Sequence, residues 1–144
     1  MSSTLFNNIA STDFMHLYKG NQLNVKKVVE LLNYQNSDVS TAVDVGVKSV
    51  RYDEKMPAVI RERATEWATA LNLVGEFFQD ANKTILWFRT PNPQLANMTP
   101  RDMIRVGRFK KLLKFIQTAL SENHTNSVVG QEEQKSKAIN IISN

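Results

Sequence analysis

The stretch that most constrains this chain is residues 87–107, because it holds three of the four prolines within ten residues. The Thr-Pro and Asn-Pro pairs at 90–93 push the residue before each proline toward extended conformations, so no helix is expected to continue through 90–94. Thr99 suits a helix N-cap, and Pro100 suits the first helical position. We therefore expect two helices joined by a stiff, extended connection, called the elbow (residues 87–107) below.

Composition excludes several classes of protein. The 144 residues are 42% hydrophobic, which is enough to bury a core, and there is no cysteine, so disulfides and thiol catalysis are excluded. His16 and His124 lie near opposite ends, which leaves little material for histidine-based metal binding or catalysis. No carboxylate pair, glycine-rich phosphate loop or nucleophile–base spacing rises above chance. We expect neither an enzyme nor a bound cofactor or metal ion.

The N-terminus lacks a signal-peptide pattern, and the longest apolar runs are far shorter than the roughly 18 residues that a membrane-spanning helix needs. Together with the absence of cysteine, this predicts a soluble, cytoplasmic protein with no membrane contact.

The first part of the chain predicts an arm followed by two helices. Residues 1–23 show no sustained hydrophobic period, and at most one short helix is expected, around 11–18. Apolar residues at helical spacing then predict a helix over 25–34, with Asn24 as N-cap. A second short helix is expected over 37–44, capped by Ser37.

The turn that follows indicates a helix-turn-helix motif. Ala42 would let two helices approach closely, and Gly46 is expected at positive φ, with Val45 and Val47 inserted into the core. The segment 48–52 would then be the recognition helix. Its outward side chains, the candidate DNA-binding residues, are Lys48, Ser49 and Arg51.

Two observations leave the DNA role open. An Ala-x-x-x-Gly turn also connects helices in proteins that do not bind DNA. Residues 1–56 carry six Lys and Arg against six Asp and Glu, so they offer little neutralisation of phosphates. DNA binding is therefore expected only as a dimer or within a larger complex.

The rest of the chain predicts a long helix and three shorter ones. The long helix runs over 57–79 with one apolar stripe, in which Trp67 is a core residue more readily than a ligand contact. Later helices are expected over 81–88 with Asp80 as N-cap, over 100–106, and over 108–121 after a break at Gly107.

In the last of these helices, Lys110, Lys111 and Lys114 lie opposite the apolar side. They form either a solubilising face or a surface for an acidic partner or DNA. Residues 122–144 are expected to be a mobile tail, although the apolar segment 138–142 could dock on a partner or on the body.

The run from Phe78 to Leu120 resembles the C-terminal domain of the Xre/MbcA/ParS-like antitoxins. In that family a Trp helix leads into a Thr-Pro-Asn loop, a Leu, a Thr-Pro helix start with an acid, a Gly, and an amphipathic last helix. The matching residues, in order, are Trp87, Thr90, Pro91, Asn92, Leu95, Thr99, Pro100, Asp102 and Gly107. One departure is that Ala96-Asn97 stands where the family commonly has a Gly pair.

The resemblance covers about residues 25–120 and implies an all-α fold, with an Xre-like helix-turn-helix region and long connecting helix (24–79) followed by a small toxin-binding domain (80–121). The residues themselves add an arm (1–23) before this region and a tail (122–144) after it, and the tail is a second departure from the family. The resemblance also implies an antitoxin of a type II toxin–antitoxin system that blocks a RES-domain toxin, an enzyme that consumes NAD. Homodimerisation through the C-terminal domain and autoregulation of the operon by DNA binding are expected with it.

An antitoxin needs a complementary surface rather than catalytic residues. We expect that surface to be formed by the elbow and the last helix, through Arg89, Asn92, Arg105, Arg108 and Lys111. The alternative is a stand-alone helix-turn-helix transcription regulator without a toxin partner, in which Lys48, Ser49 and Arg51 carry the function.

Overall fold

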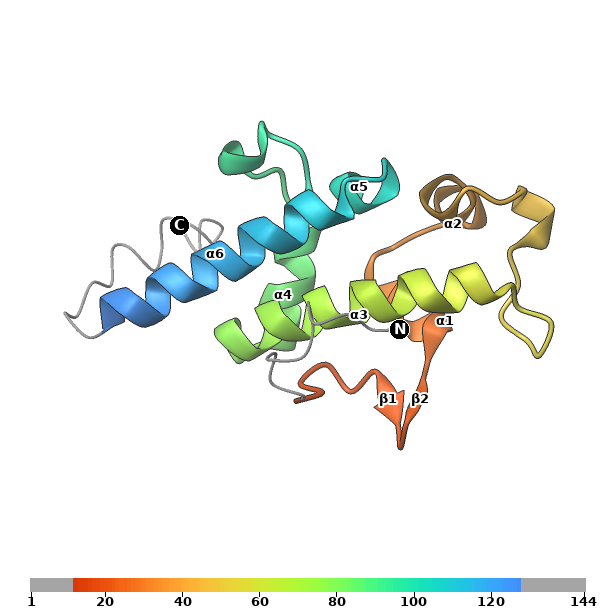
Figure 1. Cartoon of the computed structure of the whole chain (residues 1–144), viewed down its shortest axis with the longest axis horizontal. Coiled ribbons are helices and arrows are strands. Elements are labelled where there is room, and N and C mark those ends of the chain that lie inside the picture. The colour runs from red at the N-terminus through yellow and green to blue at the C-terminus, as the bar shows by residue number, and fades with distance from the viewer. Residues whose placement is uncertain (1–11, 128–144) are drawn as a thin grey trace.

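The computed structural model describes residues 12–127, with side chains through residue 123 (Figure 1). Apart from one small hairpin, these residues form an all-α fold, as predicted. The elements in chain order are β1 (Tyr18–Lys19), β2 (Gln22–Leu23), α1 (Val25–Leu31), α2 (Asn36–Val43), the 3-10 turn η2 (Val47–Ser49), α3 (Ala58–Phe78), α4 (Ala81–Phe88), the 3-10 turn η3 (Pro93–Leu95), α5 (Pro100–Arg105) and α6 (Phe109–Ser127).

Helix α3 is the centre of the fold, and it packs against α1, α2, α4 and α6. Its predicted range is confirmed: Pro57 precedes it, and Gln79 ends it in the left-handed conformation with φ 54°. The predicted apolar stripe faces the core, with Ile60, Ala64, Trp67, Leu71 and Val74 all buried. The Trp67 ring meets the Tyr34 ring edge-on at a centroid distance of 5.7 Å, so its interpretation as a core residue is confirmed.

The caps predicted before and within the elbow are confirmed. The Asp80 side chain accepts the Lys83 N–H at 2.9 Å, and the Thr99 side chain accepts the Asp102 N–H at 3.0 Å. These bonds satisfy amide donors that have no partner within their own helix. Gly107, at φ 86°, separates α5 from α6.

Within the elbow, residues 92–98 form a closed loop rather than the extended connection we expected. The Asn92 N–H donates to the Met98 carbonyl at 3.0 Å, which brings the two ends of the loop together around η3. Ala96 and Asn97, which replace the Gly pair of the resembling family, both have positive φ, at 56° and 66°. The loop therefore takes left-handed residues at these two positions without glycine, at a conformational cost.

Helix α6 extends beyond its predicted end at residue 121. It continues through Ser127, so the first residues of the expected tail are helical. Residues 128–144, including the apolar segment 138–142, lie outside the described part of the chain. On the inner side of α6 the expected apolar residues are buried: Phe109, Leu112, Leu113 and Ile116.

The short helix expected around residues 11–18 does not form over 12–18. The Asp13 carboxylate instead accepts the N–H groups of Leu17 and Tyr18, at 2.8 and 2.9 Å, and the hairpin β1–β2 follows. Met15, Leu17 and Leu23 are buried. This part of the predicted arm therefore belongs to the body, and residues 1–11 lie outside the described structure.

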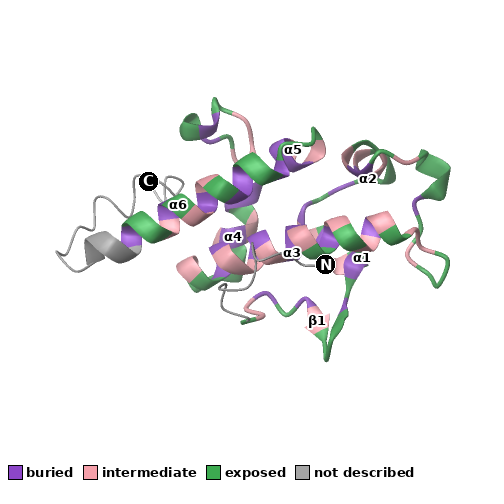
Figure 2. Ribbon diagram, in the orientation of Figure 1, coloured by how far each residue is buried: buried purple, intermediate pink, exposed green. Residues whose placement is uncertain are grey.

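The buried hydrophobic side chains form one cluster that includes residues from α1 to α6. Figure 2 shows that α3, α4 and α6 carry buried and exposed residues on different sides. No helix among residues 12–127 is long and apolar enough to cross a membrane.

Candidate partner-binding surfaces

The predicted recognition helix at residues 48–52 does not form. A single 3-10 turn, η2, covers Val47–Ser49, and Val50 after it is extended. The expected geometry of the preceding turn is also wrong, because Gly46 has φ −63° and Asp44 is the left-handed residue, at φ 61°. Val47 is 49% exposed instead of inserted into the core.

Local chemistry explains why no helix forms there. Asp53 accepts the Lys55 N–H at 3.0 Å, and the Met56 N–H donates to the Asp53 carbonyl at 3.0 Å, so a turn directly after residues 48–52 limits any helix there. Pro57 also disfavours a helical conformation at Met56. A short helix that lacks tertiary support does not recover its nucleation cost.

The second helix of the expected motif also starts differently. Helix α2 begins at Asn36, and the Asp38 carboxylate accepts the Gln35 N–H at 2.8 Å, so Ser37 lies inside the helix rather than at its cap. Helix α1 begins after Asn24 as predicted, with the Asn24 side chain accepting the Lys27 N–H at 3.1 Å.

The three candidate DNA-binding residues, Lys48, Ser49 and Arg51, are all exposed. The Arg51 guanidinium is already paired with Asp53, through bonds of 2.8 Å from Nε and 2.6 Å from Nη2. This pairing lowers the pKa of the Asp53 carboxyl below its ordinary value of 3.8. A phosphate would have to displace that carboxylate from Arg51.

The five candidate toxin-binding residues fall into two groups. Arg89, Asn92 and Arg105 are bonded to other parts of the chain, whereas Arg108 and Lys111 are exposed at the start of α6.

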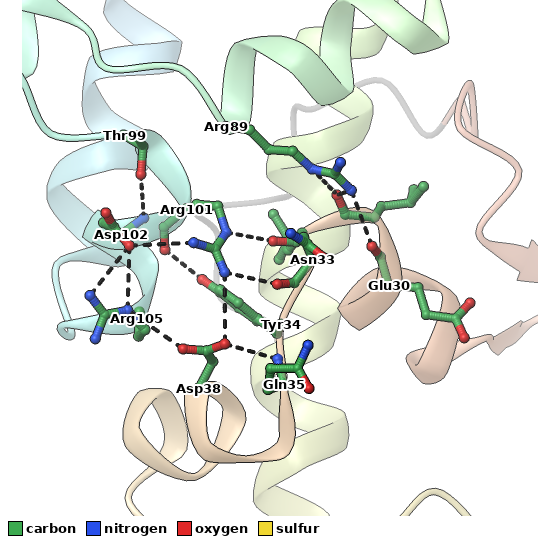
Figure 3. A network of polar contacts seen from close by, with 12 residues as sticks. Glu30, Asn33, Tyr34, Gln35, Asp38, Arg89, Thr99, Arg101, Asp102 and Arg105 are labelled. Carbon is green, nitrogen blue, oxygen red and sulfur yellow. Dashed lines mark hydrogen bonds and ion pairs between the residues drawn. The ribbon is translucent and has the colours of Figure 1, made fainter.

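Arg89 belongs to a contact between the two halves of the chain (Figure 3). Its Nη2 donates to the Leu31 carbonyl at 2.7 Å and to the Glu30 carbonyl at 3.3 Å. These carbonyls lie at the C-terminal end of α1, where the helix dipole favours a cation; the Glu30 carbonyl also accepts the Asn33 N–H at 2.9 Å. Arg89 therefore stabilises the end of α1 from the elbow.

Arg101, which was not among the predicted site residues, completes this contact. Its Nε donates to the Leu32 carbonyl at 2.6 Å, and its Nη2 donates to the Asn33 carbonyl at 2.9 Å. Together, Arg89, Arg101 and the four carbonyls of residues 30–33 form what we call the arginine clamp. One feature of the sequence indicates that Arg101 has a partner elsewhere in the chain. Arg101 lies in the first turn of α5, where the helix dipole disfavours a cation unless another contact stabilises it.

Tyr34 joins the clamp to the core. Its hydroxyl donates to the Arg101 carbonyl at 2.5 Å, and the Arg101 guanidinium lies 5.0 Å from its ring centroid. Burial raises the pKa of the Tyr34 hydroxyl well above its ordinary value of 10.0, although the nearby Arg101 charge lowers it. The phenol is therefore neutral and acts as a donor at physiological pH.

Acidic residues complete the network around Arg101 and Arg105. Asp102 lies 3.3 Å from the Arg105 Nη2 and 3.6 Å from the Arg101 Nη1. Asp38 of α2 lies 3.7 Å from Arg101 and 3.9 Å from Arg105. Arg105 is thus partly neutralised between α2 and α5, in contrast to the free surface cation that was expected.

Asn92 is not a surface residue, since it is 1% exposed. Its side-chain oxygen accepts the Gln94 N–H at 2.9 Å, which orders the start of η3. The prediction that Asn92 lies on a contact surface is therefore wrong, because its side chain is buried. Within the elbow it holds the loop closed.

The start and outer side of α6 carry exposed cations that have no acidic partner among the described side chains. We call Arg108, Lys110, Lys111 and Lys114 the cationic face. None of the ion pairs among the described residues involves them, and the Arg108 guanidinium donates to the Met98 sulfur, at 3.8 Å. The predicted outward position of the three lysines is confirmed.

This cationic face is unfavourable for the helix that carries it. Lys110 and Lys111 lie in the first turn of α6, where no acidic residue is present and where the helix dipole disfavours cations. Lys114 lies three and four residues after them, and like charges at such spacing cost about 0.2–0.5 kcal/mol per pair.

Among the described residues, no three His, Cys, Asp or Glu side chains come together in a group that could hold a metal ion.

Comparison with known proteins gives one distant likeness. No family model matches the chain, and no curated protein matches it. Among solved structures, the chain is similar to one in the crystal structure of the M. tuberculosis MbcT–MbcA toxin–antitoxin complex. The match covers 65% of this chain and 86% of that chain, at 22% sequence identity and a TM-score of 0.43. At these values the likeness does not define a shared fold.

Proposed function

We propose that the protein is an antitoxin that binds a RES-type toxin and blocks its NAD-consuming active site. The observation that carries this proposal is the order of residues in the elbow, from Trp87 to Gly107, which resembles the C-terminal domain of the Xre/MbcA/ParS-like antitoxins. Each of three landmark residues has a structural role: Trp87 is buried, Thr99 caps α5, and Gly107 separates α5 from α6.

The architecture is suited to an inhibitor. A blocking protein needs a rigid surface more than reactive groups, because a few well-buried contacts supply most of the affinity of an interface. The arginine clamp and the continuous core hold the elbow and α6 in one body. Less conformational entropy is then lost when a partner binds.

The contact would involve only part of the predicted set. Arg108 and Lys111 are exposed and can reach a partner directly. Arg89 and Arg105 would first have to leave their bonds within the chain, and Asn92 is buried. We therefore assign the toxin contact to Arg108 and Lys111 together with the outer surface of the elbow.

A direct test uses the product of a neighbouring RES-type reading frame. We expect this protein to co-purify with that product and to suppress its consumption of NAD in proportion to the amount added, to near completion at one binding equivalent. Arg63→Glu on α3, away from the proposed contact, is the control variant and should inhibit equally. Undiminished NAD consumption in the presence of excess protein, or turnover of NAD by this chain alone, would contradict the proposal.

The resemblance also leads us to propose a homodimer that autoregulates its promoter. Sedimentation should then give twice the 16.4 kDa mass of the chain. Lys48→Ala should weaken a salt-dependent shift of the promoter fragment, because Lys48 is the candidate cation with no carboxylate bound to it. The stand-alone regulator depended on a recognition helix at 48–52, and η2 in its place does not favour that alternative.

A further inference from the structure

We propose that the cationic face of α6 is a docking surface for an acidic protein surface, and that it accelerates association with the toxin by electrostatic attraction. Val106, an exposed aliphatic residue two positions before Arg108 in the sequence, supplies an apolar contact. The inference rests on the proposed function and extends it by naming the chemistry of the partner surface and the kinetic step that the face controls.

The first argument is the density of charge that has no partner within the described residues. The ion pairs there involve Arg51, Arg63, Arg101 and Arg105, and no lysine takes part in one. The cationic face differs from the other exposed lysines because it places four such cations within residues 108–114. This concentrated charge is available to a partner.

The second argument is the unfavourable position of these charges. Cations in the first turn of α6 oppose the helix dipole and repel Lys114 one turn later. No hydrogen bond or ion pair within the described residues compensates for this. Residues that are unfavourable for their own helix and gain no stabilising contact in return are characteristic of a functional surface.

The third argument is the shape of the surface. The lysines of the cationic face lie opposite the buried side of α6, which packs on α3 and α5. From Arg108 to Lys114 a helix of this pitch advances about 9 Å. Lys110, Lys111 and Lys114 share one side of α6 over that length, and Arg108 directly precedes the helix. Figure 2 shows exposed residues along this part of α6.

Val106 favours a protein as the occupant over a nucleic acid. It is 45% exposed and lies two residues before Arg108. An aliphatic side chain beside cations can be buried by a protein surface, whereas a phosphate backbone offers it little apolar area. Lysines are depleted from interface cores, so these belong to a rim, where charges act mainly on the association rate and its salt dependence.

The test compares two variants that lose the same charge. Lys110→Gln/Lys111→Gln/Lys114→Gln removes three cations from the face, and Lys19→Gln/Lys26→Gln/Lys55→Gln removes three exposed lysines from the other half. Association and dissociation rates with the RES-type toxin are measured by stopped flow at about 50 mM and 500 mM salt. Melting temperature is recorded for all three proteins.

We expect the face variant to associate about tenfold more slowly at low salt, with its dissociation rate changed less than about twofold. The difference should nearly vanish at high salt, because screening removes the attraction. The control variant should stay within about twofold of the wild type. The face variant should melt no lower than the wild type, because the removed charges were unfavourable to α6.

Other outcomes overturn the inference. If the face variant associates as fast as the wild type, or if both variants slow equally, the face is not the docking surface although the antitoxin function stands. If the wild type does not bind the toxin, the proposed function fails and the inference fails with it. Binding of a DNA duplex that only the face variant loses, with toxin binding retained, would reassign the face to nucleic acid.

Discussion

At the scale of single residues, Arg101 connects two regions that lie 68–69 positions apart in sequence. Its planar fork donates to two backbone carbonyls that follow α1, and the face of the guanidinium packs over the Tyr34 ring. Carbonyls at a helix end otherwise need water or a cap. One side chain therefore supplies a helix cap, a cation–π contact and an attachment between the halves.

Replacing Arg101 should lower stability markedly. We expect Arg101→Ala to reduce the free energy of unfolding by about 2–3 kcal/mol, because it removes charged hydrogen bonds and the cation–π contact. Arg101→Lys should recover less than half of the lost stability, since an ammonium cannot donate to two carbonyls in the planar geometry of a guanidinium. Urea unfolding measures the stability of both variants. Arg63→Ala, which breaks a half-buried pair with Glu66 within α3, should cost less than about 1 kcal/mol; an equal loss at the two arginines would contradict the clamp.

Tyr34 should make stability fall at alkaline pH. Its pKa is raised from 10.0 in the folded protein, so above pH 10 the unfolded chain loses this proton while the folded protein keeps it. The raised pKa of Tyr34 contributes fully to the free energy of unfolding below pH 10. This contribution falls as the pH rises above 10, and at pH 11 it is smaller by about 1.4 kcal/mol. Tyr34→Phe should be less stable by about 1 kcal/mol near pH 8. In urea unfolding experiments, the difference in stability between Tyr34→Phe and the wild type should disappear by pH 11. If the two proteins lose stability in parallel as the pH rises, the raised pKa of Tyr34 is not the cause.

At the scale of elements, the boundaries depend on single backbone conformations. Gly107 ends the α5 region at φ 86°, a conformation that residues with a Cβ adopt at a cost. Gly46 precedes η2 at φ −63°, which any residue can adopt. A Cβ at either glycine would meet nothing within 4 Å. The two glycines therefore differ in backbone conformation alone.

This difference predicts opposite effects of the same substitution. Gly107→Ala should destabilise the protein by about 1 kcal/mol or more, because the left-handed conformation becomes strained. Gly46→Ala should be neutral or stabilise it by about 0.4–1 kcal/mol, by restricting the unfolded chain. Thermal or urea unfolding gives both values. If Gly46→Ala destabilises the protein as much as Gly107→Ala does, the backbone angle φ does not explain the need for glycine at residue 107.

At the scale of the whole molecule, the described part of the N-terminal segment is built into the core. Met15 and Leu17 are buried, and the Met15 N–H donates to the Asn72 side chain of α3 at 2.8 Å. Gly75 of α3 leaves room for this segment, because a Cβ there would lie 2.9 Å from Phe14 and 3.0 Å from the Met15 sulfur. The hairpin, α3 and the clamp thus belong to one packed body.

Shortening a side chain of this segment should therefore resemble a core mutation. We expect Leu17→Ala to cost about 2–5 kcal/mol, the usual range for a fully buried leucine. Lys19→Ala in the same hairpin, at an exposed position, should change stability by no more than about 0.5 kcal/mol. Both are measured by urea unfolding. A small effect at Leu17 would mean that the segment packs loosely and is an arm after all.

The sequence by itself determined the features that depend on neighbouring residues. The bounds of α3 and α4 and the starts of α1 and α5 follow from local caps and from apolar residues at helical spacing. The burial of Trp67 and the outward position of the α6 lysines follow from the same periodicity. Such features need only contacts within a few turns of a helix, and a sequence pattern records those contacts directly.

Only the tertiary structure decided which polar residues are free. Arg89 and Arg101 bond to carbonyls 58–69 residues away, and Asn92 is enclosed by its own loop. It also decided that residues 48–52 form no α-helix and that Arg61 of α3 bonds to the Leu23 carbonyl of the hairpin. These outcomes depend on which distant donors and acceptors meet. Because such partners are far apart in sequence, no local pattern specifies them, and only the tertiary structure separates Arg108 from Arg89, Arg101 and Arg105, which are engaged within the chain.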